Sequence, residues 1–188
     1  KFSGAVSIHV SNLYKFSKFK KNIIIYGNTN HTKYLSKNYK NIKINQTFLS
    51  SNNKKYLSKF ISLSKRENFE IIEIHNRPNY VYEISNSLTS KLILYFHNNP
   101  LDISGSKNVN ERLDLLSKCD FIFFNSNWTK NQFFKNIDEN KYYSKFGICY
   151  QSTKKRIVNL KNKQNIISFV GKLNSAKGYD IFGKAIIK

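Results

Sequence analysis

The sequence has 188 residues, a formal net charge of +21 and 40% hydrophobic residues. This is enough apolar material for the core of one full domain, and no apolar run approaches the roughly 20 residues that a membrane-spanning helix needs. The chain contains no methionine, and its last residues keep a helical pattern without a stop signal. We therefore expect a piece of a longer protein, truncated at both ends.

The positive charge has three interpretations. The lysines are spread over the whole chain, and arginine occurs only at positions 66, 77, 112 and 156. Lysine, asparagine, isoleucine, phenylalanine and tyrosine, which A- and T-rich codons encode, are abundant, so we favour a compositional cause. Attraction to an anionic membrane surface is the second interpretation. Nucleic-acid binding is the third, and it lacks the arginine-rich cluster that would support it.

The N-terminal part predicts helices and strands in alternation. Gly4 precedes apolar residues at helical spacing, which predicts a helix over residues 5–18, and we expect a structural role for His9 on that helix. A buried strand is predicted over residues 22–27, and the alternation at Ile42 and Ile44 predicts a short second strand. The next helical pattern uses four apolar residues and a serine and ends near residues 67–68. These five residues are Tyr56, Leu57, Phe60, Ile61 and Ser64.

Two strands end in the same way. The run over residues 69–78 ends in His75, Asn76 and Arg77 before a proline, and the run over residues 91–100 delivers His97 before another proline. In open α/β sheets the ligand crevice lies outside the carboxyl ends of the strands. We therefore predict that both histidines lie at the same edge of neighbouring strands. The alternative for His75 is a capping or core histidine.

The remaining elements of the first domain follow the same alternation. Ser106 is predicted to cap one helix and Ser126 the next, and buried strands are predicted over residues 119–124 and 146–150. The alternation of strands and helices predicts an α/β fold with a parallel sheet flanked by helices. Two cysteines in strand-like apolar contexts, without metal-ligand spacing, predict two buried thiols in a reducing compartment and no metal site. They are Cys119 and Cys149.

The C-terminal stretch predicts a strand, a loop and a helix. Residues 166–170 form an apolar run typical of a buried parallel strand, and Gly178 opens an amphipathic helix. Lys172 and Lys177 lie on the loop between them. Two ammonium groups beside a helix N-terminus suit a phosphate or diphosphate. The alternative is an ordinary strand-to-helix turn in a lysine-rich protein.

The stretch "FVGKLNSAKG" resembles the F-V-G-R-L-x-x-x-K-G signature of glycosyltransferase family 4, whose members have the GT-B fold. In that family the arginine and lysine of the signature hold the diphosphate of the sugar donor. The resemblance therefore implies that Lys172 and Lys177 bind the donor diphosphate. Lys172 replaces the usual arginine, so a bidentate fork becomes a point charge.

Three further segments are similar to the same family. "SGAVSIHV" resembles the G-G-x-x-x-H-V helix entry, which implies that Gly4 lies near the donor phosphates. "IEIHNRPNY" resembles the I-H-x-H/N-x-P strand end that faces the cleft, and His97 matches the histidine of the T-x-H strand end, which faces the sugar and acceptor. Residues 151–155 depart from the P-N-G-V/I-D segment that the family usually carries.

The resemblance implies a domain plan. Residues 1–153 would form the N-terminal, Rossmann-like, acceptor-side domain of a GT-B enzyme, without its first strand. Residues 154–165 would be a basic linker, and residues 166–188 would begin the C-terminal domain that binds the nucleotide sugar.

The resemblance also implies a function, which is that of a retaining glycosyltransferase of hexosyl type. It would move a sugar from a nucleotide-diphosphate donor to a carbohydrate or lipid-linked acceptor, in the cytoplasm or at the inner face of the membrane, without a metal or another cofactor. His97 would be catalytic, and four residues would line the cleft: Gly4, His75, Asn76 and Arg77. The alternatives are a basic α/β nucleic-acid-binding module and a non-catalytic GT-B-like domain.

Overall fold

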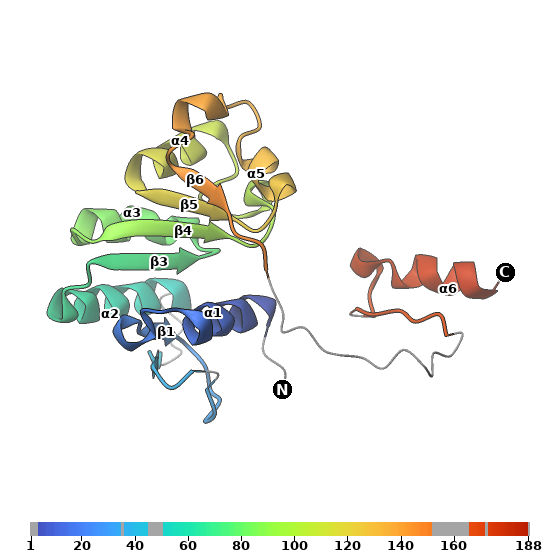
Figure 1. Ribbon diagram of the computed structural model, residues 1–188, viewed down its shortest axis with the longest axis horizontal. Helices are drawn as coiled ribbons and strands as arrows, with labels where there is room; N and C mark the ends of the chain where they lie inside the picture. Colours follow the sequence, from blue (N-terminus) through green and yellow to red (C-terminus); the bar gives the residue numbers. More distant parts are fainter. Residues whose placement is uncertain (1–3, 35, 45–50, 152–165, 172, 188) are drawn as a thin grey trace. The chain divides into compact units, whose positions relative to one another are not determined.

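A computed structural model of the chain describes residues 4–34, 36–44, 51–151, 166–171 and 173–187 (Figure 1). The chain divides into two compact units, residues 1–153 and residues 154–188. None of the described helices combines the length and the apolarity that crossing a bilayer requires.

The first unit contains both helices and strands. Its α-helices are α1 (Ala5–Phe16), α2 (Asn52–Glu67), α3 (Pro78–Ser87), α4 (Val109–Lys118) and α5 (Asn127–Phe133). Its short 3₁₀ helices are η1 (Lys20–Asn22), η2 (Pro100–Asp102) and η3 (Glu139–Tyr142). Its strands are β1 (Ile25–Gly27), β2 (Tyr39–Asn41), β3 (Ile71–His75), β4 (Lys91–Phe96), β5 (Phe121–Phe124) and β6 (Phe146–Ile148).

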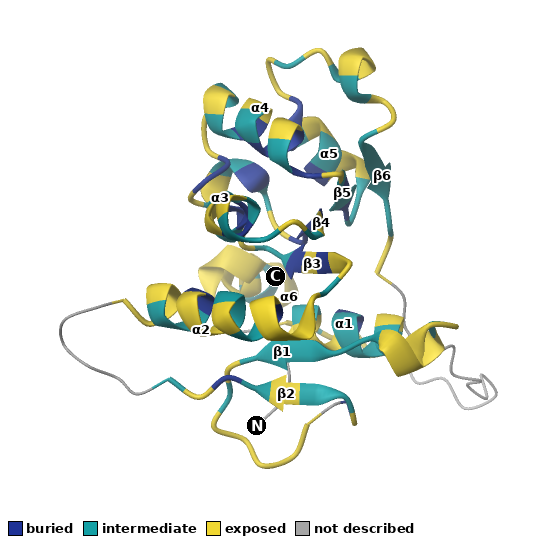
Figure 2. Ribbon diagram, turned by 90° about the vertical axis from the view of Figure 1, so that its left-hand side faces the viewer, coloured by how far each residue is buried: buried dark blue, intermediate teal, exposed yellow. Residues whose placement is uncertain are grey.

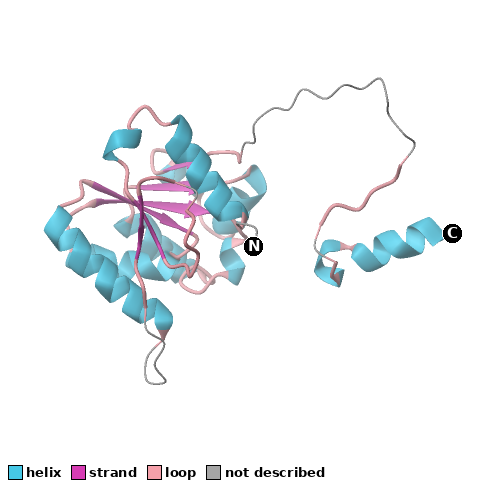
Figure 3. Ribbon diagram, turned by 90° about the horizontal axis from the view of Figure 1, so that it is seen from below, coloured by secondary structure: helices cyan, strands magenta, loops and turns pink. Residues whose placement is uncertain are grey.

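The strands form two parallel sheets. The larger sheet has four strands in the order β3-β4-β5-β6, and β1 and β2 form a separate two-stranded sheet. Figure 3 shows the strands of the larger sheet running side by side between helices. The predicted fold class is confirmed: the protein is α/β, with a Rossmann-like parallel sheet flanked by helices.

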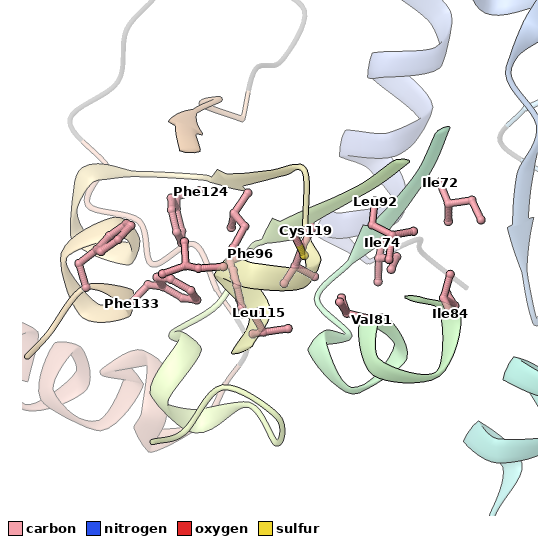
Figure 4. Close-up of a cluster of buried hydrophobic side chains, with 14 of the residues drawn as sticks. Ile72, Ile74, Val81, Ile84, Leu92, Phe96, Leu115, Cys119, Phe124 and Phe133 are labelled. Atoms are coloured by element: carbon pink, nitrogen blue, oxygen red, sulfur yellow. The ribbon is translucent and has the colours of Figure 1, made fainter. Parts of the chain in front are cut away.

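The hydrophobic core lies on one face of the larger sheet. Alternate residues of each strand point to opposite faces, and one of the two sets packs against α2, α3, α4 and α5 (Figure 4). Figure 2 shows buried positions in α3, α4 and α5, the helices that contribute to this core. The sheet residues of this core are Ile72, Ile74, Leu92, Leu94, Phe96, Ile122 and Phe124.

The predicted helix caps had different outcomes. Ser126 caps α5 as predicted, because its hydroxyl accepts a hydrogen bond from the backbone N–H of Thr129 at 3.1 Å. The cap predicted at Ser106 is wrong. Helix α4 begins after Asn108, which forms a capping box with Glu111, and this reciprocal pair satisfies two free N–H groups at once. The Ser106 hydroxyl instead donates to the carbonyl of Pro100 at 2.6 Å.

Two short N-terminal strands differ in extent from the prediction. Strand β1 covers only the last three residues of the predicted stretch 22–27, and β2 ends at Asn41, just before the alternating Ile42 and Ile44. Ile42 is buried nonetheless. Burial of an apolar side chain does not require a strand, and the alternation therefore marked the right region with the wrong boundaries. Cys119 is buried as predicted, whereas Cys149 is only half-buried.

In the second unit the described residues form the 3₁₀ helix η5 (Ser175–Lys177) and the helix α6 (Tyr179–Ile187). The strand predicted over residues 166–170 is wrong, because these residues have no regular secondary structure and Val170 is 94% exposed. A strand needs a neighbour for its backbone hydrogen bonds, and no other strand occurs among the described residues of this unit. The helix predicted to open at Gly178 is present, and Gly178 adopts the left-handed conformation with φ 72°.

Candidate functional site

His75 and His97 meet at the carboxyl edge of the larger sheet. His75 is the last residue of β3, and His97 follows directly after β4, which pairs with β3 in parallel. Nδ1 of His75 lies 2.9 Å from Nε2 of His97. The prediction that the two histidines lie at the same edge of neighbouring strands is confirmed.

The two rings belong to a longer line of side chains. Oε1 of Glu73 lies 2.9 Å from Nε2 of His75, and Nε2 of Gln151 lies 3.0 Å from Nδ1 of His97. Glu73 is on the same face of β3 as His75, because side chains two residues apart on a strand share a face. We call these four residues, Glu73, His75, His97 and Gln151, the histidine relay.

His97 is a neutral imidazole at physiological pH. Burial, reinforced by the neighbouring His75 and His9, lowers the pKa of His97 from 6.5 to about 3. A neutral imidazole has one ring nitrogen that donates a hydrogen bond and one that accepts. The side chain can therefore orient and polarise a bound group without carrying a charge.

Two asparagine side chains hold the backbone of His97 in place. The backbone N–H of His97 donates to Oδ1 of Asn76 at 3.2 Å, and its carbonyl accepts from Nδ2 of Asn125 at 2.8 Å. Asn76 follows β3 and Asn125 follows β5, so both neighbours of β4 contribute. Asn76 adopts a left-handed backbone with φ 56°, a conformation that asparagine tolerates better than most residues. His97 is thus positioned through both of its backbone polar groups.

Helix α1 contributes a third histidine, His9, which packs against the rings of His75, Tyr95 and His97. The ring of His9 lies 5.2 Å from that of His97 and 5.0 Å from that of Tyr95, in edge-on contacts with angles of 73° and 62° between the planes. His9 is 5% exposed, and its Nε2 has no hydrogen-bond partner among the described residues. Burial, followed by the nearby His75, lowers the pKa of His9. A structural role was expected for His9. In the structure its ring contacts the rings of His75, Tyr95 and His97 at this edge of the sheet, so it belongs to the histidine cluster.

Tyr95 stacks against the imidazole rings of His75 and His97. Its ring stacks on that of His97 at 4.3 Å with an angle of 12° between the planes. Its hydroxyl donates to the carbonyl of Cys149, just beyond β6, so one side chain links two strand ends of the sheet. Burial and this hydrogen bond raise the pKa of Tyr95. The hydroxyl therefore stays protonated and serves as a structural donor.

The other predicted site residues are not in this cluster. Arg77 is exposed at the start of α3, where its guanidinium contacts the carbonyl of Asn76 at 3.2 Å. Gly4 is the exposed N-cap of α1, with open space where a Cβ would stand. Lys177 ends η5 in the second unit, whose placement relative to the first is not described, and Lys172 lies outside the described residues.

Five residues of the site escaped sequence reasoning as functional candidates. Alternation along β3 could have identified Glu73, and the helix-entry motif could have identified His9. The same alternation along β4 could have identified Tyr95, which stacks on His97 two residues later, although its hydroxyl partner is distant. Nothing in the local sequence marks Asn125 and Gln151 as partners of His97.

Comparison of the chain with models of known protein families and with curated proteins finds no match. Within the described part of the chain, no group of three or more histidine, cysteine, aspartate or glutamate residues is arranged to hold a metal ion. Sequence motifs, fold and the geometry at the sheet edge are therefore the basis for assigning a function.

Proposed function

We propose that the chain is part of a retaining glycosyltransferase with the GT-B fold, similar to family 4, which moves a hexosyl group from a nucleotide-diphosphate donor to a hydroxyl acceptor. The observation that carries this proposal is the position of His97. A neutral, buried imidazole, held through its backbone on both sides, stands at the carboxyl edge of a parallel sheet. Ligands of open α/β sheets bind at such edges.

Each proposed role follows from the charge that develops during the reaction. When the bond between the sugar and the diphosphate breaks, negative charge grows on the leaving diphosphate, and Lys172 and Lys177 would stabilise it. The helix dipole and the free N–H groups at the N-terminus of α1, after Gly4, favour an anion as well. The first turn of α1 contains no acidic residue that would repel one. His97 would orient or polarise the reacting sugar. His75, Asn76 and Arg77 would line the cleft.

The proposed acceptor is a carbohydrate or a lipid-linked saccharide in the synthesis of a cell-surface polysaccharide or lipopolysaccharide. Attraction of the chain, with its net charge of +21, to an anionic membrane surface is the second interpretation of that charge, and under it the enzyme would be peripheral to the inner face. The proposed location is therefore cytoplasmic. The nucleotide sugar would be a co-substrate, and the reaction as proposed uses no resident metal or cofactor.

Calorimetry with a panel of nucleoside diphosphates tests the proposal on the full-length protein. Charge-assisted contacts are worth about 1.5–3 kcal/mol each, so Lys177→Ala should weaken nucleoside-diphosphate binding by roughly tenfold to a hundredfold. Lys172→Arg should bind equally well or better, because it restores the fork of the family signature. Unchanged affinity in Lys177→Ala, or no binding of any nucleoside diphosphate to the unaltered protein, would refute the proposed donor site.

A further inference from the structure

The hydrogen bonds of the histidine relay run in one direction. A carboxylate accepts hydrogen bonds and has no proton to donate, so Nε2 of His75, at 2.9 Å from Glu73, is the donor of that pair. In a neutral ring the other nitrogen is then the acceptor. Glu73 thus makes Nδ1 of His75 an acceptor.

The same reasoning extends to His97. Since Nδ1 of His75 accepts, Nε2 of His97, at 2.9 Å from it, must donate. The neutral ring of His97 then has its lone pair on Nδ1, where the amide N–H of Gln151 donates at 3.0 Å. Each of the three contacts has one donor and one acceptor, and an ionised Glu73 admits no other assignment for two neutral rings.

The end of the relay is accessible to a ligand. Gln151 is exposed, whereas His97 is buried and held through its backbone. A donor group that takes the place of the Gln151 amide would meet the Nδ1 lone pair of a histidine whose backbone is held by two hydrogen bonds. The acceptor, Nδ1 of His97, therefore belongs to a buried histidine held through its backbone, whereas its present donor, the exposed Gln151 amide, can be replaced by a ligand group.

We propose that Glu73 is a positioning residue that acts through His75: it holds His97 in the tautomer with the proton on Nε2 and keeps Nδ1 of His97 as an acceptor for a hydrogen-bond donor of the ligand. The relay itself is a property of the described residues. Only the chemical class of the donor, a saccharide hydroxyl, rests on the proposed function.

Reversal of the first residue tests the relay. Glu73→Lys puts a pure donor where a pure acceptor stood, so Nε2 of His75 should become an acceptor and its Nδ1 a donor. The proton of His97 should then move from Nε2 to Nδ1. Glu73→Gln, which can donate or accept, should populate both tautomers of His97. Glu73 has a partly exposed side chain, so neither substitution opens the core.

The readout is the protonation of each ring nitrogen, from long-range proton–nitrogen NMR spectra of the nitrogen-labelled chain without ligand. The chain has only four histidines, so substitution of each one assigns the spectrum. Glu70→Lys is the matched control, because it makes the same charge change just before the start of β3, away from the histidines at its end. It should leave the His97 tautomer unchanged, and circular dichroism verifies the fold of every variant.

The outcomes separate this inference from the proposed function. A switch of the His97 proton in Glu73→Lys but not in Glu70→Lys supports the relay, even if calorimetry shows no nucleoside-diphosphate binding. An unchanged His97 tautomer in both Glu73 variants overturns the relay, even if such binding is strong. If Glu73→Lys fails to fold, a single unchanged tautomer in Glu73→Gln overturns it equally.

Discussion

The two faces of the larger sheet are built from the same four strands and differ in almost every other respect. One face presents only apolar side chains to α2, α3, α4 and α5. The other face presents Glu73, His75 and Tyr95, continues into His97, and packs against His9 of α1. The side chains of the two faces alternate along each strand, so neighbours in sequence have opposite surroundings.

The difference shows how this domain divides stability from function. The apolar face buries large side chains, and such burial is the main favourable term in folding. The opposite side of the sheet buries the two imidazole rings of His9 and His97 and the ring of Tyr95. Their polar atoms need partners, and a missing partner costs free energy. Residues of the first kind should therefore determine stability, and residues of the second kind the chemistry at the edge.

The largest expected effect is the loss of stability when one of two neighbouring phenylalanines of β5 is replaced by alanine. Phe124 is fully buried among Phe96, Phe133, Phe134 and Phe146, so Phe124→Ala should lower the free energy of unfolding by about 3–5 kcal/mol. Phe123, on the opposite face, is only half-buried, and Phe123→Ala should cost less than half as much. Equilibrium unfolding in urea measures both, and equal losses would contradict the contrast between the faces.

The next effect is a pH dependence that the polar face alone should cause. The pKa of His97 is about 3 in the folded protein and near 6.5 in the unfolded chain, so below pH 6.5 the unfolded chain binds a proton that the folded protein does not. The contribution of His97 to the free energy of unfolding is fully present above about pH 6.5 and is lost progressively as the pH falls toward 3. Between about pH 7 and about pH 5 the loss should reach at most about 2 kcal/mol, since solvent screening reduces it.

The matched variant for this pH dependence is His97→Gln, which has no imidazole to titrate. Its free energy of unfolding should change less between about pH 7 and about pH 5, where most carboxylates stay ionised. Some dependence of stability on pH should remain in the variant, because the pKa of His9 is also lowered and His9 is still present. Urea unfolding at several pH values measures both proteins. Identical pH profiles would show that His97 is protonated equally in the folded and unfolded states.

A third effect concerns the backbone at Asn76. Both Asn76→Gly and Asn76→Ala remove the oxygen that accepts from the N–H of His97, but only alanine puts a Cβ into the left-handed conformation at φ 56°. Asn76→Ala should therefore be less stable than Asn76→Gly by about 1 kcal/mol. Chemical denaturation of the two variants gives this difference directly. Equal stability would mean that the backbone leaves the left-handed region when the side chain is shortened.

The strands that hold the site could be predicted because their signals are local. A buried apolar run followed by histidine and proline defines both β3 and β4, and the parallel alternation places their ends together. The cap at Ser126 was predictable for the same reason. The relay could be predicted only in part, since Gln151 reaches His97 from a segment beyond β6, and no local pattern indicates that contact.

The errors have physical causes as well. The run at residues 166–170 has the composition of a buried strand, but a strand depends on neighbours that composition does not report. At the start of α4 two polar residues could each have been the cap, and the reciprocal bond between Asn108 and Glu111 decided between them. Competition between local candidates and dependence on distant partners thus limit what sequence patterns predict here.

The smallest expected effect has the opposite sign and tests the polar face most directly. His9 is 5% exposed and its Nε2 has no hydrogen-bond partner among the described residues, so the folded protein bears the cost of a buried polar atom. His9→Phe keeps an aromatic ring against Tyr95 and removes that atom. It should leave the free energy of unfolding unchanged or raise it by up to about 1 kcal/mol.

The control for this substitution is His9→Ala, which removes the ring and leaves a cavity between α1 and the sheet, so it should destabilise the protein. Urea unfolding near pH 7.5 compares the three proteins at a pH well above the lowered pKa of His9. A loss of stability in His9→Phe similar to that in His9→Ala would show that Nε2 of His9 has a partner in solution, such as a bound water. If the full-length protein proves to transfer a sugar as proposed, a stable His9→Phe protein without that activity would show that this imidazole is retained for chemistry at the expense of stability.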